Sequence, residues 1–171
     1  METAILVEDM AADDWPGVHR IYTEGIATTF ATLDSEAPDW NHFDHSHRHD
    51  CRLVARDRRA GPVLGWTALT AYSQRRVYAG VAWESVYVAE VARGRGVGRA
   101  LLEAVIPASE AAGIWTLLAA VLAENVASLA LHEAVGFRPV GVERGLGQDG
   151  RGRWRDVHLL ERRSRLVGIN R

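Results

Sequence analysis

The segment from Ser85 to Arg99 constrains the fold of this chain more than any other part of the sequence. An apolar strand runs through Val88, and a helical run from Ala100 to Ala112 begins directly after Arg99. The turn between them alternates small and basic residues: Arg93, Gly94, Arg95, Gly96, Val97, Gly98 and Arg99. Glycine lets the backbone approach a ligand closely, and the first N–H groups of a helix are unpaired and carry partial positive charge. This pattern predicts a binding site for an anion, with a pyrophosphate as the best fit.

The spacing of the glycines discriminates between kinds of anion site. The dinucleotide fingerprint needs G-x-G-x-x-G and an acidic residue about 20 positions later. Here the glycines run G-x-G-x-G, and the apolar stretch 117–122 occupies that later region. A P-loop would need G-x-x-x-x-G-K-[ST], which this chain lacks. Arg93, Gly96 and Gly98 instead match the R/Q-x-x-G-x-G/A motif of the GCN5-related N-acetyltransferases, which the turn resembles. In that family the loop wraps the pyrophosphate of acetyl-coenzyme A; the alternative is a glycine-rich turn that merely opens a helix.

Length, composition and charge bound the class of protein. A chain of 171 residues with 47% hydrophobic and 25% charged residues suits one soluble domain with a sizeable core. We expect that domain over residues 1–165 and a mobile tail over 166–171. The net charge of −2 gives no global indication of nucleic acid or an anionic membrane as partner, because the basic residues are local, near 93–99 and 151–165.

The number of cysteines and the length of the apolar stretches indicate the cellular compartment of the protein. Cys51 is the single cysteine, so no internal disulfide forms and a reducing compartment fits. The first residues are acidic and do not read as a signal peptide, and no stretch reaches 18 uncharged apolar residues. We therefore expect a cytoplasmic protein without a membrane span.

Hydrophobic periodicity predicts the element order β-α-α-β-β-β-α-β-α-β-β, a mixed α/β fold. The expected strands are residues 4–7, 51–57, 62–72, 77–88, 114–122, 137–142 and 154–161. The expected helices are residues 15–26, 39–49, 98–112 and 125–134. Pro107 predicts a kink in the third helix, and residues 143–152 read as a glycine-rich turn.

A second motif strengthens the resemblance. Asn125 to Phe137 is similar to the family segment N-x-x-[AS]-x-x-[LF]-Y-x-x-x-G-F. The resemblance implies that Asn125 binds the pantetheine arm or the cofactor, and that Ser128 lies near the pyrophosphate or adenine side. His132 replaces the tyrosine that protonates the departing thiolate. Asn125 also reads as a helix cap, and the two roles are compatible.

Residues 5–161 resemble one branch in particular, the phosphinothricin and methionine sulfoximine acetyltransferases. The similar segments are Ile21-Tyr22, Thr28 to Thr32, Trp83 to Val88, Leu131 to Phe137 and Gly152 to Val157. The resemblance implies a mostly antiparallel sheet of six or seven strands, flanked by four helices and splayed between the fourth and fifth strands. It also implies acetyl-CoA as co-substrate, cofactor contacts at Val86, Tyr87 and Val88, an oxyanion donor in the backbone of Val86 or Val88, and a homodimer.

The chemistry needs a neutral amine. An amine with a pKa of about 10.4 is neutral roughly once in 2,500 molecules at pH 7, so a general base raises the reactive fraction. Glu84 is the candidate, but the branch carries its glutamate where Trp83 stands here. A one-residue offset in a strand points a side chain to the other face. Either a bulge restores Glu84 to the site or the base role is weakened or moved; a plain salt bridge is the structural alternative.

The residues that recognise the acceptor amine are expected in loops that face the strand 77–88. The candidate residues are Phe30, Thr32, Tyr72, Ser73, Gln74, Arg75, Trp83 and Ser85. Arg75 or Arg76 would hold a carboxylate or phosphinate in bidentate fashion.

Four histidines fall in the expected helix 39–49. The spacing places His42, His45 and His49 on one face, which suits either a metal site or a solvated, His-rich face. No cysteine or clear carboxylate completes a ligand set, so no metal is expected.

These inferences define three hypotheses. The first is acetyl transfer from acetyl-CoA to the α-amino group of a small amino-acid-like molecule such as phosphinothricin or methionine sulfoximine, giving detoxification or resistance. The second keeps the chemistry but uses a peptide or protein amine. The third is a non-catalytic regulator that binds acyl-CoA.

Overall fold

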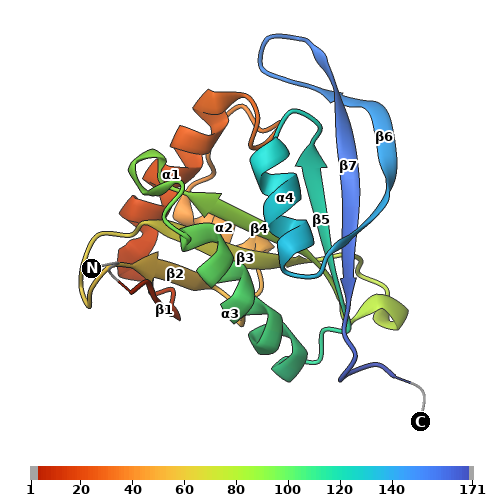
Figure 1. Ribbon diagram of the computed structural model, residues 1–171, viewed down its shortest axis with the longest axis horizontal. Coiled ribbons are helices and arrows are strands. Elements are labelled where there is room, and N and C mark those ends of the chain that lie inside the picture. The colour runs from red at the N-terminus through yellow and green to blue at the C-terminus, as the bar shows by residue number, and fades with distance from the viewer. Residues whose placement is uncertain (1–3, 170–171) are drawn as a thin grey trace.

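The computed structural model describes residues 4–169 and contains one seven-stranded sheet with four α-helices (Figure 1). The strands are β1 (Leu6–Asp9), β2 (Leu53–Arg56), β3 (Gly65–Ala71), β4 (Val81–Val88), β5 (Thr116–Leu122), β6 (Arg138–Gln148) and β7 (Trp154–Arg163). The helices are α1 (Trp15–Thr28), α2 (Trp40–Ser46), α3 (Val97–Ala111) and α4 (Val126–Ala134). The element order predicted from the sequence is confirmed.

The sheet order is β1-β2-β3-β4-β5-β7-β6. Among the described strands, β4 and β5 form the parallel pair and the other pairs are antiparallel. The β4–β5 ladder covers only Val81 to Trp83 against Thr116 to Leu118. Beyond Trp83 the two strands separate, so the predicted splay between the fourth and fifth strands is present.

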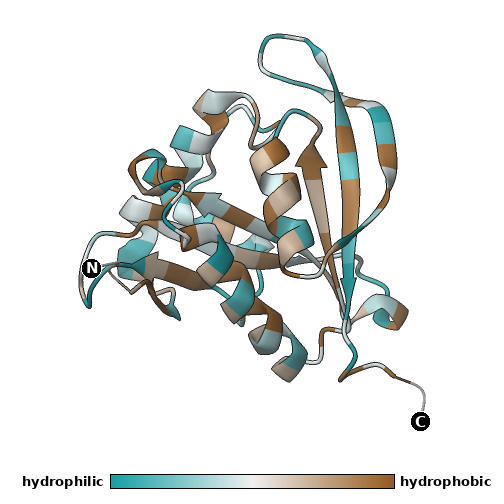
Figure 2. Ribbon diagram, viewed as in Figure 1, coloured by the Kyte–Doolittle hydropathy of each residue, from teal (hydrophilic) through white to brown (hydrophobic). Residues whose placement is uncertain are grey.

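Helices cover both faces of the sheet. On one face α1 and α2 pack against aromatic side chains of β3 and β4, where Trp66 stacks on Tyr87 at 4.7 Å and meets Phe43 of α2 edge-on. On the other face α3 packs over β2 to β4, and α4 lies beside it next to β5 (Figure 1). Figure 2 shows apolar residues concentrated in the central strands. Strand β3 is buried from Gly65 to Leu69 because it is covered on both sides.

Three predicted boundaries were wrong, because contacts from outside the predicted segments decide where these elements begin and end. The second helix ends at Ser46 rather than 49, because the buried Arg52 guanidinium takes the carbonyl groups of Asp44, His47 and Arg48 and the chain wraps around it. Strand β4 begins at Val81 rather than 77. Its start follows Gly80, where any Cβ would meet the Trp115 ring at 2.0 Å.

The third error concerns residues 143–152. They are not one glycine-rich turn, because β6 continues to Gln148 opposite Trp154. A register shift between Glu143 and Gly147 lets β6 include the glycines of this segment.

The C-terminal segment and α3 complete the fold. Helix α3 continues through Pro107 to Ala111. Strand β7 runs to Arg163, and the Ser164 N–H donates to the Trp115 carbonyl at 2.8 Å. Residues 170–171 lie outside the described part, so mobility of 166–171 stays a prediction. Over residues 4–169, none of the helices is both long and apolar enough to cross a membrane.

Candidate active site

The opening between β4 and β5 exposes one edge of β4. The Tyr72 N–H donates to the Val81 carbonyl at 3.1 Å, so Val81 and every second residue after it pair with β3. The alternate residues, Glu84, Val86 and Val88, therefore direct their backbone groups toward β5. Because the β4–β5 ladder stops at Trp83, the N–H groups of Val86 and Val88 face the opening.

Two cavities meet at this opening. The inner cavity, about 340 Å³, lies between β4, β5, α4 and the loop after α1. The turn cavity, about 470 Å³, lies over the turn that opens α3. Five residues line both cavities: Ala31, Val86, Tyr87, Asn125 and Ser128. An extended ligand would therefore pass from one cavity to the other along β4.

The predicted anion-binding turn forms one wall of the turn cavity. The residues that line it are Val88, Arg93, Gly94, Gly96, Val97, Gly98 and Arg99, whereas Arg95 is exposed outside the lining. Gly94 and Gly96 have φ of +74° and +78°, which L side chains rarely adopt. A Cβ on Gly98 would meet Leu131 at 2.9 Å. The glycines thus leave the N-terminus of α3 open, and with Arg93 and Arg99 the wall fits the diphosphate of acetyl-CoA.

A buried acid–base pair lies in the inner cavity. Glu84 Oε2 is 2.9 Å from His132 Nε2, and the two side chains are only 1% and 3% exposed. The other carboxylate oxygen accepts from the Thr67 hydroxyl at 3.3 Å. His132 Nδ1 lies 2.7 Å from the Ser128 carbonyl, which can only accept, so Nδ1 carries a proton. Nε2 is therefore the nitrogen that shares a proton with Glu84.

The environment of His132 favours its protonated form. Burial by itself lowers the pKa of His132, but the hydrogen bond and the negative charge of Glu84, together with the Ser128 carbonyl, outweigh burial and raise that pKa above 6.5. The contact with Glu84 therefore favours the imidazolium over the neutral imidazole.

The strand register explains how Glu84 reaches this position. Pairing of β3 with β4 is continuous from Gly65–Val88 to Ala71–Ala82, with no bulge between these described residues. Glu84 points toward the face that carries α4, opposite to Trp83, as strict alternation requires. Its partner there is His132, not an arginine. Its role as base stays a prediction.

The opposite wall of the inner cavity comes from α1 and the loop after it. The Tyr22 hydroxyl donates to Asp34 Oδ2 at 2.6 Å, and the Tyr22 ring lies 4.8 Å from that of Tyr87. Burial is the main reason that the pKa values of both phenols are raised. The sequence did not assign Tyr22 or Asp34 to the site: Tyr22 appeared only in the Ile21-Tyr22 segment of the resemblance, and no motif marks Asp34.

The acceptor candidates fall into two groups. Thr32, Trp83 and Ser85 line the inner cavity, and Phe30 lines the turn cavity. The segment Tyr72, Ser73, Gln74 and Arg75 lines neither. Tyr72 lies 6.0 Å from Trp83, and the Arg75 guanidinium lies 5.4 Å from the Tyr78 ring. The inner-cavity lining, taken over the described residues, contains Glu84 and Asp34 but no arginine or lysine.

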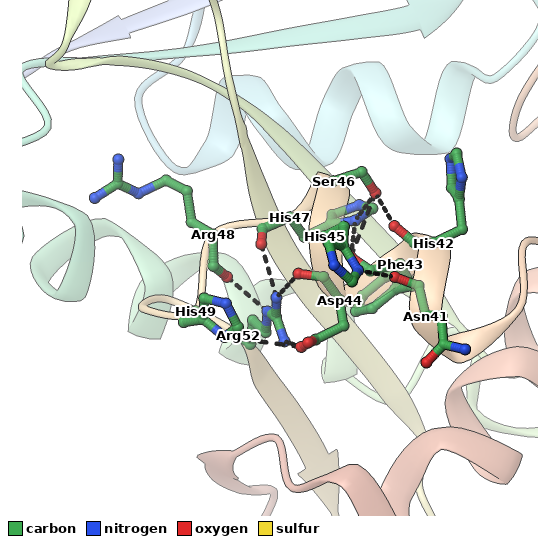
Figure 3. A network of polar contacts seen from close by, with 10 residues as sticks. All are labelled: Asn41, His42, Phe43, Asp44, His45, Ser46, His47, Arg48, His49 and Arg52. Atoms are coloured by element: carbon green, nitrogen blue, oxygen red, sulfur yellow. Dashed lines mark hydrogen bonds and ion pairs between the residues drawn. The ribbon is translucent and has the colours of Figure 1, made fainter.

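The histidine cluster does not form the predicted single helical face. Because α2 ends at Ser46, His49 lies beyond the helix, and the His42 ring points away from the other rings (Figure 3). His47 instead stacks on Phe43 at 4.0 Å. Between residues 4 and 169 no group of three or more His, Cys, Asp or Glu side chains is arranged to hold a metal ion.

Comparison with known proteins decides the family. The model of the acetyltransferase (GNAT) family matches residues 9–137. The chain belongs to the GNAT family. This GNAT protein is 36% identical to the phosphinothricin N-acetyltransferase of Alcaligenes faecalis, over 93% of this chain and 82% of that one. It is 30% identical to the L-methionine sulfoximine/L-methionine sulfone acetyltransferase of Pseudomonas paraeruginosa, over 91% and 92% of the two chains.

A solved structure supports the same assignment. The phosphinothricin acetyltransferase of Sinorhizobium meliloti, in complex with acetyl-CoA, has a TM-score of 0.86 and 27% identity, covering 98% of this chain and 92% of its own. The resemblance inferred from the sequence is thereby confirmed. The GNAT protein is an acetyl-CoA-dependent N-acetyltransferase, so the hypothesis of a non-catalytic regulator is set aside.

Proposed function

We propose that this GNAT enzyme acetylates the α-amino group of a small amino-acid-like molecule of the phosphinothricin or methionine sulfoximine class, and thereby confers detoxification or resistance. Relatives named for those substrates, 30–36% identical over most of the chain, support this substrate class. The observation that carries the chemistry is the buried Glu84–His132 pair, which lines the inner cavity together with Val86, a residue that also lines the turn cavity.

The cofactor fits along the two cavities. The turn Arg93–Arg99 would hold the diphosphate, while Asn125 and Ser128 line the path of the pantetheine arm. Acetyl-CoA supplies an acetyl group activated as a thioester. The N–H of Val86 or Val88, at the opening beyond Trp83, would donate to the oxygen that gains negative charge when the amine attacks.

The acid–base pair passes one proton through the reaction. The acceptor ammonium loses two protons on the way to the amide. One leaves to solvent before the attack, Glu84 accepts the other from the attacking nitrogen, and the His132 imidazolium donates its Nε2 proton to the departing sulfur. The proton on Glu84 then passes to Nε2 within the hydrogen bond that joins Oε2 and Nε2 at 2.9 Å, which restores the carboxylate and the imidazolium. The pair ends each turnover as it began, and the thiolate, with a pKa of about 8.5, needs little further help.

Acceptor recognition is divided between the inner cavity and its rim. The Glu84 and Asp34 carboxylates attract the ammonium group, while Thr32, Trp83, Ser85 and Phe30 shape the walls. A carboxylate or phosphinate of the acceptor needs a cation that is free to bind it. The inner-cavity lining described above has no arginine or lysine, and His132 is paired with Glu84. We assign that role to Arg75, on the exposed segment that begins at Tyr72 beside Trp83.

The proposed substrate class is tested by thiol release from acetyl-CoA with a matched panel of amines. Phosphinothricin, methionine sulfoximine and methionine sulfone are compared with their decarboxylated amines and with short peptides that have a free N-terminus. Turnover confined to the amino-acid analogues supports the proposal. Efficient use of peptides instead would favour the second hypothesis, acetylation of a peptide or protein amine.

The quaternary state and location are also proposals. We infer a cytoplasmic homodimer that uses neither nucleic acid nor membrane as partner. The exposed apolar side chains of the β6–β7 hairpin support self-association: Val140 (53% exposed), Val142 (48%), Leu146 (52%) and Trp154 (67%). Light scattering at several concentrations, with Val142→Glu as the disrupting variant, measures the oligomeric state.

A further inference from the structure

A buried arginine on β7 joins three segments around the mouth of the active site. The Arg155 side chain is only 4% exposed, and no step of the proposed reaction uses it. Burying a charge is costly unless partners satisfy it. Arg155 donates from Nη1 to Asp149 at 2.8 Å, and its Nε and Nη2 make a bidentate contact with Glu124 at 3.1 and 3.0 Å.

The partners of Arg155 connect it to the residues that line the two cavities. Glu124 directly precedes Asn125, whose side chain accepts from the Ser128 N–H at 3.1 Å and starts α4. The guanidinium carbon of Arg155 lies 5.9 Å from the centroid of the Phe30 ring, within the range of a cation–π contact. Phe30 lines the turn cavity, and Asn125 lines both cavities.

The third partner of Arg155, Asp149, is also held in place by donors other than Arg155. The other oxygen of Asp149 accepts the backbone N–H groups of Arg151 and Arg153, and the Arg153 side chain donates to the same oxygen as Arg155. Burial acts to raise the pKa of Asp149, but these donors outweigh it and hold that pKa well below its usual range. Asp149 is therefore a fixed anion, and Arg155 extends from it toward Glu124 and Phe30.

We propose that Arg155 is a positioning residue for the cofactor. Held by Asp149, it fixes Glu124 and thereby the adjacent Asn125. It also holds the Phe30 ring beside the path of the cofactor. It touches neither the reacting atoms nor the Glu84–His132 pair. The bidentate geometry requires the planar guanidinium fork, which lysine lacks. This inference rests on the cofactor placement proposed above.

The test measures binding of coenzyme A itself by titration calorimetry, together with KM for each substrate. Arg155→Met is expected to raise the Kd for coenzyme A and the KM for acetyl-CoA about tenfold, since charge-assisted hydrogen bonds are lost. The KM for the amine is expected to change less than the KM for acetyl-CoA, because Phe30 is the one residue of this link that is also assigned to the acceptor site. Arg155→Lys is expected to remain defective, because it keeps the charge without the fork.

Two further variants separate positioning from general stability. Arg153→Ala removes another partner of Asp149 but contacts neither Glu124 nor Phe30, and it is expected to bind coenzyme A like the wild type. Glu124→Ala changes a half-exposed side chain and reports on the same link if Arg155→Met does not fold. Wild-type affinity in Arg155→Met or Glu124→Ala, or an equal loss in Arg153→Ala, would overturn the proposal. A wild-type enzyme that does not bind coenzyme A would overturn the cofactor placement as well.

Discussion

Glu84 and His132 are 48 positions apart in the chain, yet their carboxylate and imidazole lie 2.9 Å apart and almost fully buried. The contact depends on two features of the fold. Strand alternation turns Glu84 toward the face that carries α4, and the separation of β4 from β5 lets α4 approach that face. The burial and the hydrogen-bond partner of each residue therefore come from tertiary contacts and not from its own strand or helix.

The first prediction concerns Glu84→Gln. The amide keeps the shape of the carboxylate but cannot accept the amine proton, so kcat is expected to fall about 10²- to 10³-fold. KM for acetyl-CoA changes little, because Glu84 does not line the turn cavity. Steady-state kinetics with each substrate varied in turn measure the effects on kcat and on KM separately. The control is Glu133→Gln, which removes an exposed carboxylate next to His132 on α4. If the kcat of Glu84→Gln equals that of Glu133→Gln, Glu84 takes no part in the mechanism.

A second prediction follows from the raised pKa of His132. Its folded-state value lies above the ordinary 6.5, so protonation stabilises the fold. That contribution is complete below pH 6.5 and is lost as the pH rises through the folded-state pKa. The difference in unfolding free energy between wild type and His132→Gln is therefore expected to shrink with rising pH. Denaturant unfolding from pH 5.5 to 9 measures it, and a pH-independent difference would contradict a stabilising charge on His132.

The sequence predicted those parts of the fold and site that depend on local patterns. The turn Arg93–Arg99 and the cap at Asn125 follow from short motifs, because glycine conformation and helix-end chemistry act within a few residues. The element order followed from hydrophobic periodicity, and the splay followed from the family resemblance. The bulge that would have moved Glu84 to the face of Trp83 is not present, and the partner of Glu84 is His132 on the α4 face.

The features that sequence reasoning missed depend on distant contacts. The end of α2 depends on Arg52, which competes for the carbonyl groups near Asp44. The contact between Tyr22 and Asp34, and the link from Arg155 to Glu124 and Phe30, join segments with no shared local pattern. Such contacts become visible only when the tertiary structure brings the segments together.

A third prediction concerns the glycine turn. Gly96 has φ of +78°, so Gly96→Ala is expected to introduce a strain of about 1–2 kcal/mol and weaken binding of coenzyme A roughly tenfold. The matched control is Gly150→Ala, since Gly150 is exposed, lacks a positive φ and has open space around its Cβ position. Calorimetry gives the affinity, and thermal unfolding shows whether the fold is retained. Unchanged affinity in a folded Gly96→Ala protein would show that the diphosphate does not bind at this turn.

The last prediction tests the cation assigned to the acceptor. Arg75 is exposed, and its guanidinium lies over Tyr78, so Arg75→Gln leaves the core untouched. Loss of a bidentate contact with a carboxylate is expected to raise the KM for an amino-acid acceptor by about one to two orders of magnitude. KM for acetyl-CoA and the KM for a decarboxylated amine stay constant. Arg76→Gln, at the neighbouring exposed position, tells which arginine makes the contact. If both variants keep the wild-type KM for the amino acid, the acceptor carboxylate binds elsewhere, and the segment after Tyr72 plays no part in recognition.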